Sequence, residues 1–513
     1  MNINLKQAGF YFSCLFLSIM LSVVFSFSVD ARGNYIPVDS CGVLDQPSTT
    51  YVLQNDVSTN GTCFIINADD ITLDGQGHNV DGIGSIYTQA IFVQNKENIL
   101  IKNFNITEFG VGIYFDSVDN SIVENNEITS SSTGAFYSID SHSNFVRDNY
   151  FSDSTTNNDV IVIIEGSGNE VEKNQIFLSG NDGIFIDYES YSNIIRNNSI
   201  IGSAFDGIEI DGFNNEIMDN FISEGNRGIK ISGGTATGNI VEDNQIVFNT
   251  GSGIILEFNA NNNELKNNLI DSNEYGIIFF TSFDNLIVDS TIKNSVIDAV
   301  YLSSSSSDNN VFVDLIIENT SGFGYDLNIV SGGLDNTTLI DTDIQRYSFN
   351  GNTANFVKSN FGEIRFTEEI SGDGEALSED IVIEFNLAKV ESDNNPGLNR
   401  SAKISLFGNP GENFDNPIIL RNGLACPAEI CTALTPLDAK TVVFTVSGWT
   451  EYSIGESCIG DLNNDGNVNS TDQAILLGSW GECSEETCSS DLNNDGFVNS
   501  ADLARLLGNW GEC

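Results

Sequence analysis

The chain has 513 residues, and 20 basic against 72 acidic side chains give it a formal net charge of −52 at pH 7. Nucleic acid and anionic membrane surfaces repel such a protein, so binding to either is excluded as its function. The acidic surface favours solubility in salt and attracts divalent cations, but it does not indicate a reaction.

The chain begins with a predicted secretion signal, residues 1–31. Lys6 precedes an apolar run over residues 9–27, and small residues offer a cleavage site after Ser28 or Ala31. The alternative is a transmembrane anchor, because the run is close to spanning length. The small residues at the cleavage position favour removal of the segment. We therefore expect a mature chain that is secreted or held at the cell surface and is not an integral membrane protein.

The cysteines agree with export. Of the nine in the sequence, Cys14 lies in the signal, which leaves an even number, as expected of disulfides formed in an oxidising compartment. Cys41 and Cys63 could close a local loop, and Cys426 and Cys431 bracket a short turn. We therefore predict two local bridges in addition to those of the C-terminal repeat described below.

Residues 32–348 carry a repeat in which an asparagine precedes an apolar strand. The eleven anchors are Asn98, Asn120, Asn144, Asn169, Asn193, Asn215, Asn239, Asn263, Asn285, Asn310 and Asn336. Their spacing of 22–26 residues predicts stacked single-coil units, because one coil cannot bury its own apolar face. This coil length is typical of a three-sided, right-handed parallel β-helix. We predict a mainly β chain with about eleven such coils and an N-terminal cap.

Asparagine also returns five residues after the anchor in eight of these coils. These residues are Asn103, Asn125, Asn149, Asn174, Asn198, Asn220, Asn244 and Asn268. Stacked coils would superpose them into a ladder in which the side-chain amides bond one another along the axis. Such a ladder would satisfy polar groups that are costly to bury.

A Gly-Ile pair occurs midway in many coils, and strand alternation turns the isoleucine inward and its neighbour outward. The outward side chains of successive coils then stack on one face. On three neighbouring coils this face gathers the candidate catalytic residues Asp187, Glu209, Asp211 and Lys230. Paired carboxylates can serve as acid and base in glycoside hydrolysis. Alternatively, carboxylates could hold calcium against a uronate while a basic residue removes the α-proton.

The repeat resembles the β-helix superfamily of pectate lyases, polygalacturonases and periplasmic copper-binding proteins. The segment Thr72-Leu-Asp-Gly-Gln-Gly-His78 is similar to the first coil of the copper-binding group, and Arg227-Gly-Ile-Lys230 is similar to the Arg-x-Lys motif of polygalacturonases. This superfamily includes lyases, hydrolases, epimerases and non-catalytic surface proteins, so the resemblance implies the fold and not one reaction. Copper delivery is not expected, because His78 and His142 are the only histidines.

Residues 349–456 lose the period and predict a β-sandwich. Short alternating strands are expected at residues 361–366, 380–385, 402–406 and 441–446, separated by Gly, Asn and Pro. The segment resembles a module often found after β-helices in microbial surface proteins, which implies a spacer or binding role.

Residues 457–513 contain one twelve-residue loop written twice, at 461–472 and 491–502. Each copy has oxygen-bearing side chains at positions 1, 3, 5, 9 and 12, a glycine at position 6 and a backbone carbonyl at position 7, which matches the needs of calcium. The predicted ligands are Asp461, Asn463, Asp465, Asn467, Asn469 and Asp472 in the first loop and Asp491, Asn493, Asp495, Phe497, Asn499 and Asp502 in the second. Each loop runs into an apolar helix, so we predict two half EF-hands that hold two calcium ions.

This tandem resembles the type I dockerin, the module that docks enzymes onto cohesin-bearing scaffolds. The resemblance covers Gly460 to Cys513 and implies a cohesin-type partner. Ser470 and Thr471 match a pair that many dockerins present to cohesin, whereas Leu477 stands where many have a basic residue.

Four cysteines repeat with these loops: Cys458, Cys483, Cys488 and Cys513. The simplest pairing is one bridge per repeat, 458–483 and 488–513, and the alternative is 458–513 with 483–488. A zinc site is a competing interpretation that the exported context disfavours.

Two functions follow from these observations. The first is a secreted polysaccharide-binding or polysaccharide-degrading protein, of hydrolase or lyase type, attached to a scaffold through its dockerin. The acidic cluster and aromatic residues such as Phe185 and Phe280, which could stack on sugar, support it. The second is a non-catalytic surface display or adhesion protein with a β-helix stalk. In that case the clustered acidic residues would be ordinary solvated positions of an acidic protein.

Overall fold

A computed structural model describes residues 35–152, 158–303, 307–318, 320–330, 336–463, 465–483, 488–493 and 495–512. The predicted signal at residues 1–31, together with its alternative as a membrane anchor, lies outside the described residues. Among the residues that the structure describes, no helix is both long and apolar enough to span a membrane.

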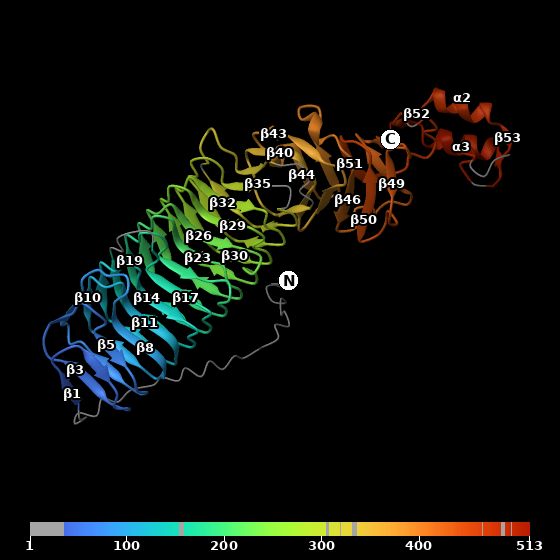
Figure 1. The fold of residues 1–513 in the computed structure, drawn as a ribbon. Coiled ribbons are helices and arrows are strands. Elements are labelled where there is room, and N and C mark those ends of the chain that lie inside the picture. The colour runs from blue at the N-terminus through green and yellow to red at the C-terminus, as the bar shows by residue number, and fades with distance from the viewer. Residues whose placement is uncertain are drawn as a thin grey trace, which may run out of the picture.

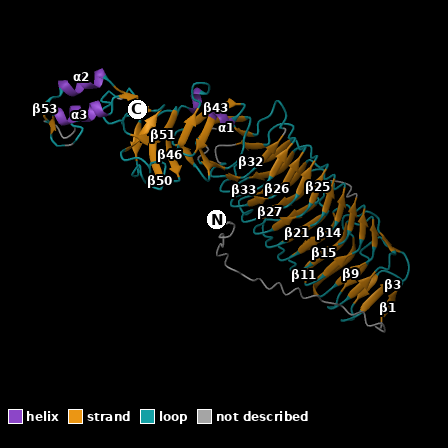
Figure 2. Ribbon diagram, turned by 180° about the vertical axis from the view of Figure 1, so that it is seen from behind, coloured by secondary structure: helices purple, strands orange, loops and turns teal. Residues whose placement is uncertain are grey.

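The N-terminal two-thirds of the chain form a parallel β-solenoid of about 13 turns, each giving one short strand to each of three sheets (Figures 1 and 2). Sheet A contains β1 (Tyr35–Val38), β3 (Thr50–Leu53), β6 (Thr72–Asp74), β9 (Leu100–Lys102), β12 (Ile122–Glu124), β15 (Phe145–Arg147), β18 (Glu170–Glu172), β21 (Ile194–Arg196), β24 (Glu216–Met218), β27 (Ile240–Glu242), β30 (Glu264–Lys266), β33 (Leu286–Val288), β36 (Val311–Val313), β39 (Thr337–Ile340) and β41 (Ala354–Lys358).

Sheet B, on which the candidate site lies, contains β2 (Gly42–Leu44), β5 (Phe64–Ile66), β8 (Gln89–Glu97), β11 (Val111–Asp119), β14 (Gly134–Ile139), β17 (Ile161–Ile164), β20 (Ile184–Ile186), β23 (Asp206–Ile210), β26 (Arg227–Ser232), β29 (Ser252–Glu257), β32 (Tyr275–Phe280), β35 (Val300–Ser303), β38 (Leu327–Ile329) and β40 (Tyr347–Asn352). Sheet C contains β4 (Val57–Ser58), β7 (Asn79–Asp81), β10 (Asn105–Thr107), β13 (Glu127–Thr129), β16 (Tyr150–Ser152), β19 (Gln175–Phe177), β22 (Ser199–Ile201), β25 (Phe221–Ser223), β28 (Gln245–Val247), β31 (Leu269–Asp271), β34 (Thr291–Lys293) and β37 (Ile316–Glu318).

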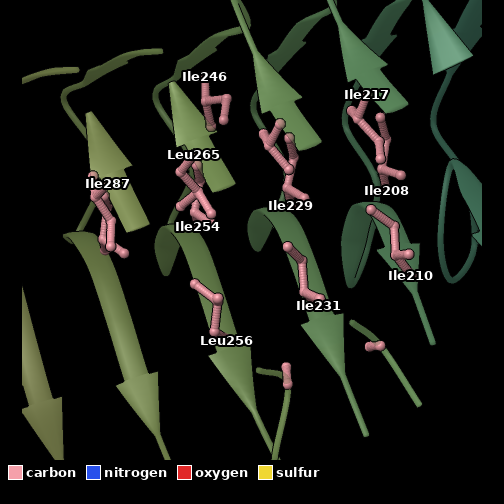
Figure 3. Close-up of a cluster of buried hydrophobic side chains, with 14 of the residues drawn as sticks. Ile208, Ile210, Ile217, Ile229, Ile231, Ile246, Ile254, Leu256, Leu265 and Ile287 are labelled. Carbon is pink, nitrogen blue, oxygen red and sulfur yellow. The ribbon is translucent and has the colours of Figure 1, made fainter. Parts of the chain in front are cut away.

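The solenoid core consists of stacked aliphatic side chains, as the Gly-Ile pattern predicts. Ile208 and Ile210 of β23 pair in register with Ile229 and Ile231 of β26, and all four are fully buried (Figure 3). Burial of an isoleucine side chain is worth roughly 1.5–3 kcal/mol. The same step repeated in each turn makes one continuous core, so the outward face of sheet B is held on a rigid support.

Two asparagine ladders run along the solenoid. In the first, the anchors from Asn144 to Asn310 are buried. The side-chain oxygen of Asn144 accepts the backbone N–H of Ser121, and that of each later anchor accepts the backbone N–H of the anchor before it. In the second, Asn198 accepts the backbone and side-chain N–H groups of Asn174 and donates to Asn220 and to the carbonyl of Val171. Seven asparagines make up this second ladder: Asn126, Asn149, Asn174, Asn198, Asn220, Asn244 and Asn268.

The second ladder confirms the prediction from Asn149 onward but corrects its start. Asn126 rather than Asn125 is the first member, because Asn125 takes a left-handed turn conformation with φ of 55° and Asn126 is the buried residue. Asn103 also has positive φ and bonds to Asp74 instead. Asparagine suits both the ladder and the left-handed turn, so the sequence did not distinguish the two uses.

Antiparallel strands follow the solenoid and agree with the predicted sandwich. Sheet A continues through β42 (Gly362–Phe366), β46 (Ala402–Phe407), β50 (Thr441–Val446) and β49 (Cys431–Ala433). A second sheet contains β44 (Ile381–Glu384), β45 (Leu387–Val390), β51 (Glu451–Glu456), β47 (Pro417–Arg421) and β48 (Leu424–Ala425). Strand β43 (Ile370–Gly374) pairs with β40, and α1 (Leu377–Asp380) and the 3₁₀ turn η1 (Pro396–Leu398) connect strands.

The C-terminal unit is a duplicated loop and helix at the far end of the rod (Figure 1). Its elements are β52 (Asn467–Val468), α2 (Ser470–Gly478), β53 (Gly481–Glu482), β54 (Phe497–Val498), α3 (Ser500–Gly508) and β55 (Gly511–Glu512). Strands β52 and β55 pair, as do β53 and β54, so the two copies are interlocked. A small core of Val468, Leu476, Val498 and Leu506 joins them.

Disulfides with both partners described are Cys41–Cys63, Cys426–Cys431 and Cys483–Cys488. The first two confirm the predicted local bridges. The third shows that the simplest pairing of the C-terminal repeat was wrong, because Cys483 is bonded to Cys488 and not to Cys458. Cys458 is also disulfide-bonded, which removes the zinc alternative, whereas Cys513 lies outside the described residues. The bridge joins the two repeats rather than closing one.

Candidate functional site

The candidate site lies on the outward face of sheet B, over strands β20, β23, β26 and β29. Register places Phe185 beside Glu209, Glu209 beside Lys230, and Lys230 beside Ile255. Closer to the N-terminus, the same column contains the aromatic rings of Phe92, Tyr114 and Tyr137, whose successive centroids are 5.6 and 5.4 Å apart. An aromatic row therefore leads along the face to a group of charged residues.

Lys230 lies between two carboxylates. Its Nζ is 2.8 Å from Oε1 of Glu209 and 3.3 Å from Oε1 of Glu257. The side chains of Lys230 and Glu209 are each 15% exposed, and that of Glu257 is 12% exposed. Such a lightly solvated pair of contacts is stronger than a surface ion pair, because water screens it less. The predicted interpretation of these positions as ordinary solvated ones is therefore wrong for Glu209 and Lys230.

A deeper layer of carboxylates underlies Glu209. Asp206 pairs with Arg227 through two contacts of 2.5 and 2.9 Å and is 1% exposed. Asp182, also 1% exposed, accepts the backbone N–H of Asp206, and Asp159 accepts that of Asp182. Carboxylate oxygens of Asp182, Asp206 and Glu209 lie within 4.8 Å of one another. We call Asp182, Asp206, Glu209, Asp211, Arg227, Lys230 and Glu257 the carboxyl cluster.

Burial and mutual repulsion separate the pKa values of these acids. Burial, a hydrogen bond to Glu209 and the charges of Asp206 and Asp159 raise the pKa of Asp182 to about 9. Burial raises the pKa of Asp206 to about 6 against the opposing effect of Arg227. Burial and the charge of Glu209 raise the pKa of Asp211 to about 7. At neutral pH Asp182 therefore carries a proton, and Asp211 is poised to exchange one.

Lys230 remains a cation in this setting. Burial acts to lower its pKa, but the hydrogen bond and charge of Glu209, with the charges of Asp206 and Glu257, raise the pKa above the ordinary lysine value. A lysine held in this way positions carboxylates and does not accept a proton near neutral pH.

Three of the four predicted catalytic residues come together here, and Asp187 is used differently. Glu209, Asp211 and Lys230 share the face of β23 and β26. Asp187 lies close enough to act on the pKa of Asp211, but its Oδ1 accepts the hydroxyl of Ser190 at 2.8 Å and the backbone N–H of Glu165 at 3.0 Å. Asp187 therefore fixes the turn after β20. Oδ1 of Asp211 is buried without a hydrogen-bond partner among the described groups.

Sequence reasoning missed Asp182 and Asp206, and it noted Arg227 only as part of a motif and did not name it as a site residue. Strict alternation places residues three apart on opposite faces of a strand, so Asp206 was not expected beside Glu209. Register skips Gly207, which has no room for a Cβ because the side chain of Ile222 would lie 2.3 Å away. Asp206 thereby turns to the outward face. The signal available was the charged residue directly before three successive Gly-Ile pairs, namely Asp182, Asp206 and Arg227.

The first C-terminal loop is shaped as a cation-binding turn. Carboxylate oxygens of Asp461, Asp465 and Asp472 lie within 4.8 Å of one another. Asp472 is fully buried, and its two oxygens accept the backbone N–H groups of Leu462 and Asn469. An all-oxygen donor set with a buried carboxylate fits calcium. These residues would coordinate the ion, with the loop wrapped around it.

The second loop repeats the hydrogen bonds that shape the first one. Asp491 accepts the N–H of Gly496 at 2.7 Å, as Asp461 accepts that of Gly466 at 2.8 Å. Both glycines have positive φ, 84° and 87°, which the tight turn requires. Asn469, predicted as a ligand, caps α2 by accepting the N–H of Thr471. The remaining predicted ligands stay predictions.

Family models match the solenoid and the duplicated loops. Residues 89–212 and 192–344 match the right handed beta helix region, and residues 459–508 match the dockerin type I domain. The chain carries a right-handed β-helix and a type I dockerin. Dockerin domains bind cohesin, type I dockerins generally bind calcium, and dockerin-bearing carbohydrate-active β-helix proteins are typically extracellular. No curated protein matches the chain in a sequence comparison.

Solved structures similar to the chain include β-helix enzymes of polysaccharide metabolism. An exopolygalacturonase from Thermotoga maritima is 14% identical over 54% of this chain and 84% of its own, with a TM-score of 0.44. A mannuronan C-5 epimerase A-module from Azotobacter vinelandii is 16% identical over 55% and 87%, with a TM-score of 0.40. An alginate lyase from Paenibacillus is 12% identical over 56% and 93%, with a TM-score of 0.32. At this identity the likeness concerns the fold alone.

Proposed function

We propose that this chain is a secreted enzyme that hydrolyses a polysaccharide at the carboxyl cluster and is attached to a cohesin scaffold through its dockerin. The observation that carries the proposal is the convergence of Asp182, Asp206 and Glu209 within 4.8 Å, with pKa values that differ among neighbouring acids. Neighbouring acids with separated pKa values are a mark of acid and base roles in one site. Burial of this many charged groups also lowers the stability of the fold, and packing of the core does not require these groups.

Asp211 is the proposed general acid, and Glu209 is the second acidic residue of the reaction. Asp211 has a pKa near 7, so it can donate a proton to a leaving oxygen at neutral pH. Lys230 holds Glu209 in place. Glu209 lies in β23, and Asp211 directly follows the last residue of that strand. Inverting glycosidases hold their two carboxyl groups roughly 6.5–9.5 Å apart and retaining ones about 5–5.5 Å apart, so the stereochemistry of the product would report the working separation of these two acids.

The lyase alternative is supported less well. Removal of an α-proton from a uronate by Lys230 needs its unprotonated amine, and the carboxylates around Lys230 keep it protonated. The cluster also holds five carboxyl groups against two cations, so a polyanionic substrate would be repelled unless a divalent cation intervened. A neutral polysaccharide suits the site better.

The dockerin is proposed to bind two calcium ions and to present α2 and α3 to its partner. Leu477 and Trp480 of the first repeat are each 49% exposed, and Leu507 and Trp510 of the second are 50% and 48% exposed. Each repeat therefore offers the same apolar pair. Exposed apolar side chains on a small calcium-bound module are typical of a protein-binding surface.

The test is the product released by the full mature chain from soluble neutral and uronate polysaccharides. New reducing ends without unsaturated uronides are the expected result, and Asp211→Asn should abolish their release. Asp289→Asn is the matched control, because Asp289 is an exposed turn residue of the same solenoid. Unsaturated products would instead support a lyase, and no product from any polysaccharide would support the display protein.

A further inference from the structure

A second groove lies on sheet A, away from the carboxyl cluster on sheet B. It has a volume of about 470 Å³, within the range of small-molecule and sugar-sized sites. Strands β6, β9, β12 and β15 form it, and its floor is the outward face of these four neighbouring turns. In Figure 2, β9 and β15 lie near the N-terminal end of the rod.

The floor is a run of apolar side chains that the rest of the column does not repeat. Leu100, Ile122 and Phe145 follow one another in register, and Phe145 is 38% exposed. Thr72 precedes them and Glu170 follows them in the same column. Farther along, the outward residues alternate between glutamate and isoleucine: Glu170, Ile194, Glu216, Ile240 and Glu264. Beyond Glu264 only the apolar pair Leu286 and Val311 follows before Thr338, so the run of three apolar residues belongs to the groove.

The edge of the groove is polar but carries little charge. Asp70, Asn98, Asn120 and Ser143 occupy the same left-handed turn position in four successive coils, with φ between 51° and 59°. Their small side chains are exposed, and Asn98 donates to Asp70. Amide and hydroxyl groups on this edge can both donate and accept hydrogen bonds.

The neighbouring outward column holds cations that are already paired. Lys102 lies 3.6 Å from Asp74, and Arg147 lies 2.7 Å from Glu124. With Asp70 on the opposite edge, the groove offers no cation that is free of a carboxylate among the residues named here. An anionic ligand would therefore meet net negative charge.

We propose that this groove binds an extended, neutral polysaccharide strand that lies parallel to the solenoid axis. The apolar floor would pack against the C–H faces of the sugar rings, and the amides and hydroxyls of the edge would bond their hydroxyl groups. The turn repeat of about 4.8 Å is close to the length of one pyranose in an extended chain, so each turn would meet an equivalent sugar. The inference rests on the proposed function because it takes a polysaccharide as the ligand. It adds a second binding site for the polysaccharide, away from the carboxyl cluster.

Affinity electrophoresis of the full mature chain in gels containing glucomannan, xyloglucan, arabinoxylan or galactan tests the groove, with polygalacturonate as the anionic comparison. The inactive Asp211→Asn background prevents degradation during the run. At least one neutral glycan should retard the protein, and Phe145→Ala and Leu100→Thr should each weaken that binding at least tenfold. Ile240→Thr is the matched control, because Ile240 is an outward residue of the same column outside the groove.

Binding that survives both groove substitutions would overturn the proposal, as would retardation by polygalacturonate alone or by none of the glycans. Thermal unfolding of each variant shows whether it folds. The single variant Phe145→Ala, with Asp211 intact, should still hydrolyse short oligosaccharides. Loss of glycan binding by the groove can therefore be told apart from loss of catalytic activity. If the chain hydrolyses nothing yet Phe145→Ala loses glycan binding, the groove stands and the catalytic proposal fails.

Discussion

Replacement of Asn198 by alanine should destabilise the solenoid by about 2–6 kcal/mol. The side chain of Asn198 is 2% exposed and satisfies two backbone groups, the carbonyl of Val171 and the N–H of Asn174. Each buried polar group left without a partner costs roughly 1–3 kcal/mol. The side chains of Asn174 and Asn220 lose one bond each but keep another, to Val146 and to the backbone N–H of Asn198, so they add little.

Urea unfolding followed by far-ultraviolet circular dichroism measures this loss, and hydrogen exchange of β18 and β21 locates it, because a solenoid can open locally. Asn60→Ala is the control, since Asn60 is exposed in the loop between β4 and β5 and should change stability by no more than about 0.5 kcal/mol. A change of less than about 0.5 kcal/mol for Asn198→Ala would refute the reasoning that the ladder satisfies the backbone.

Two further predictions concern calcium and pH. Chelation of calcium should unfold the dockerin while the solenoid stays folded, because the loops fold around the ion. The double substitution Asp461→Ala with Asp491→Ala should have the same effect. Unchanged calcium binding by this variant in titration calorimetry would contradict the ligand assignment. The folded chain holds protons on Asp206 and Asp211 that the unfolded chain releases above pH 3.8. Stability should therefore fall as pH rises from about 4 to 7, by roughly 3 kcal/mol for Asp206 alone. The test is the melting temperature measured against pH in high salt, which screens the general charge repulsion. A melting temperature that does not change with pH would disprove the raised pKa values of Asp206 and Asp211.

The repeat made the architecture predictable, because each turn obeys the same local rule. Every aliphatic residue after a Gly-Ile glycine must face the core, and Ile208 and Ile229 do. The ladder was predictable from Asn149 onward for the same reason. Its start was not, because Asn125 and Asn126 are adjacent and either could enter the core; backbone conformation decided between them.

The site was predictable only in part. Alternation placed Glu209 and Lys230 on one face, as observed. It could not place Asp182, which lies before β20, or Asp206, which alternation assigns to the opposite face from Glu209. The pairing of Cys483 with Cys488 was equally hidden, since identical spacing in the two repeats is compatible with bridges within or between them. Interactions between turns, rather than within one, decided each of these cases.

The initial rate of reducing-end release from a neutral polysaccharide, measured against pH for the wild type and Asp211→Asn, tests the central claim most directly. Asp211 must be protonated to act as the acid, so the wild-type rate should fall as pH rises through about 7. Asp211→Asn should lower the rate by roughly 10²–10⁴-fold and remove that descending limb. A wild-type rate and pH profile in Asp211→Asn would contradict the assignment of catalysis to the carboxyl cluster.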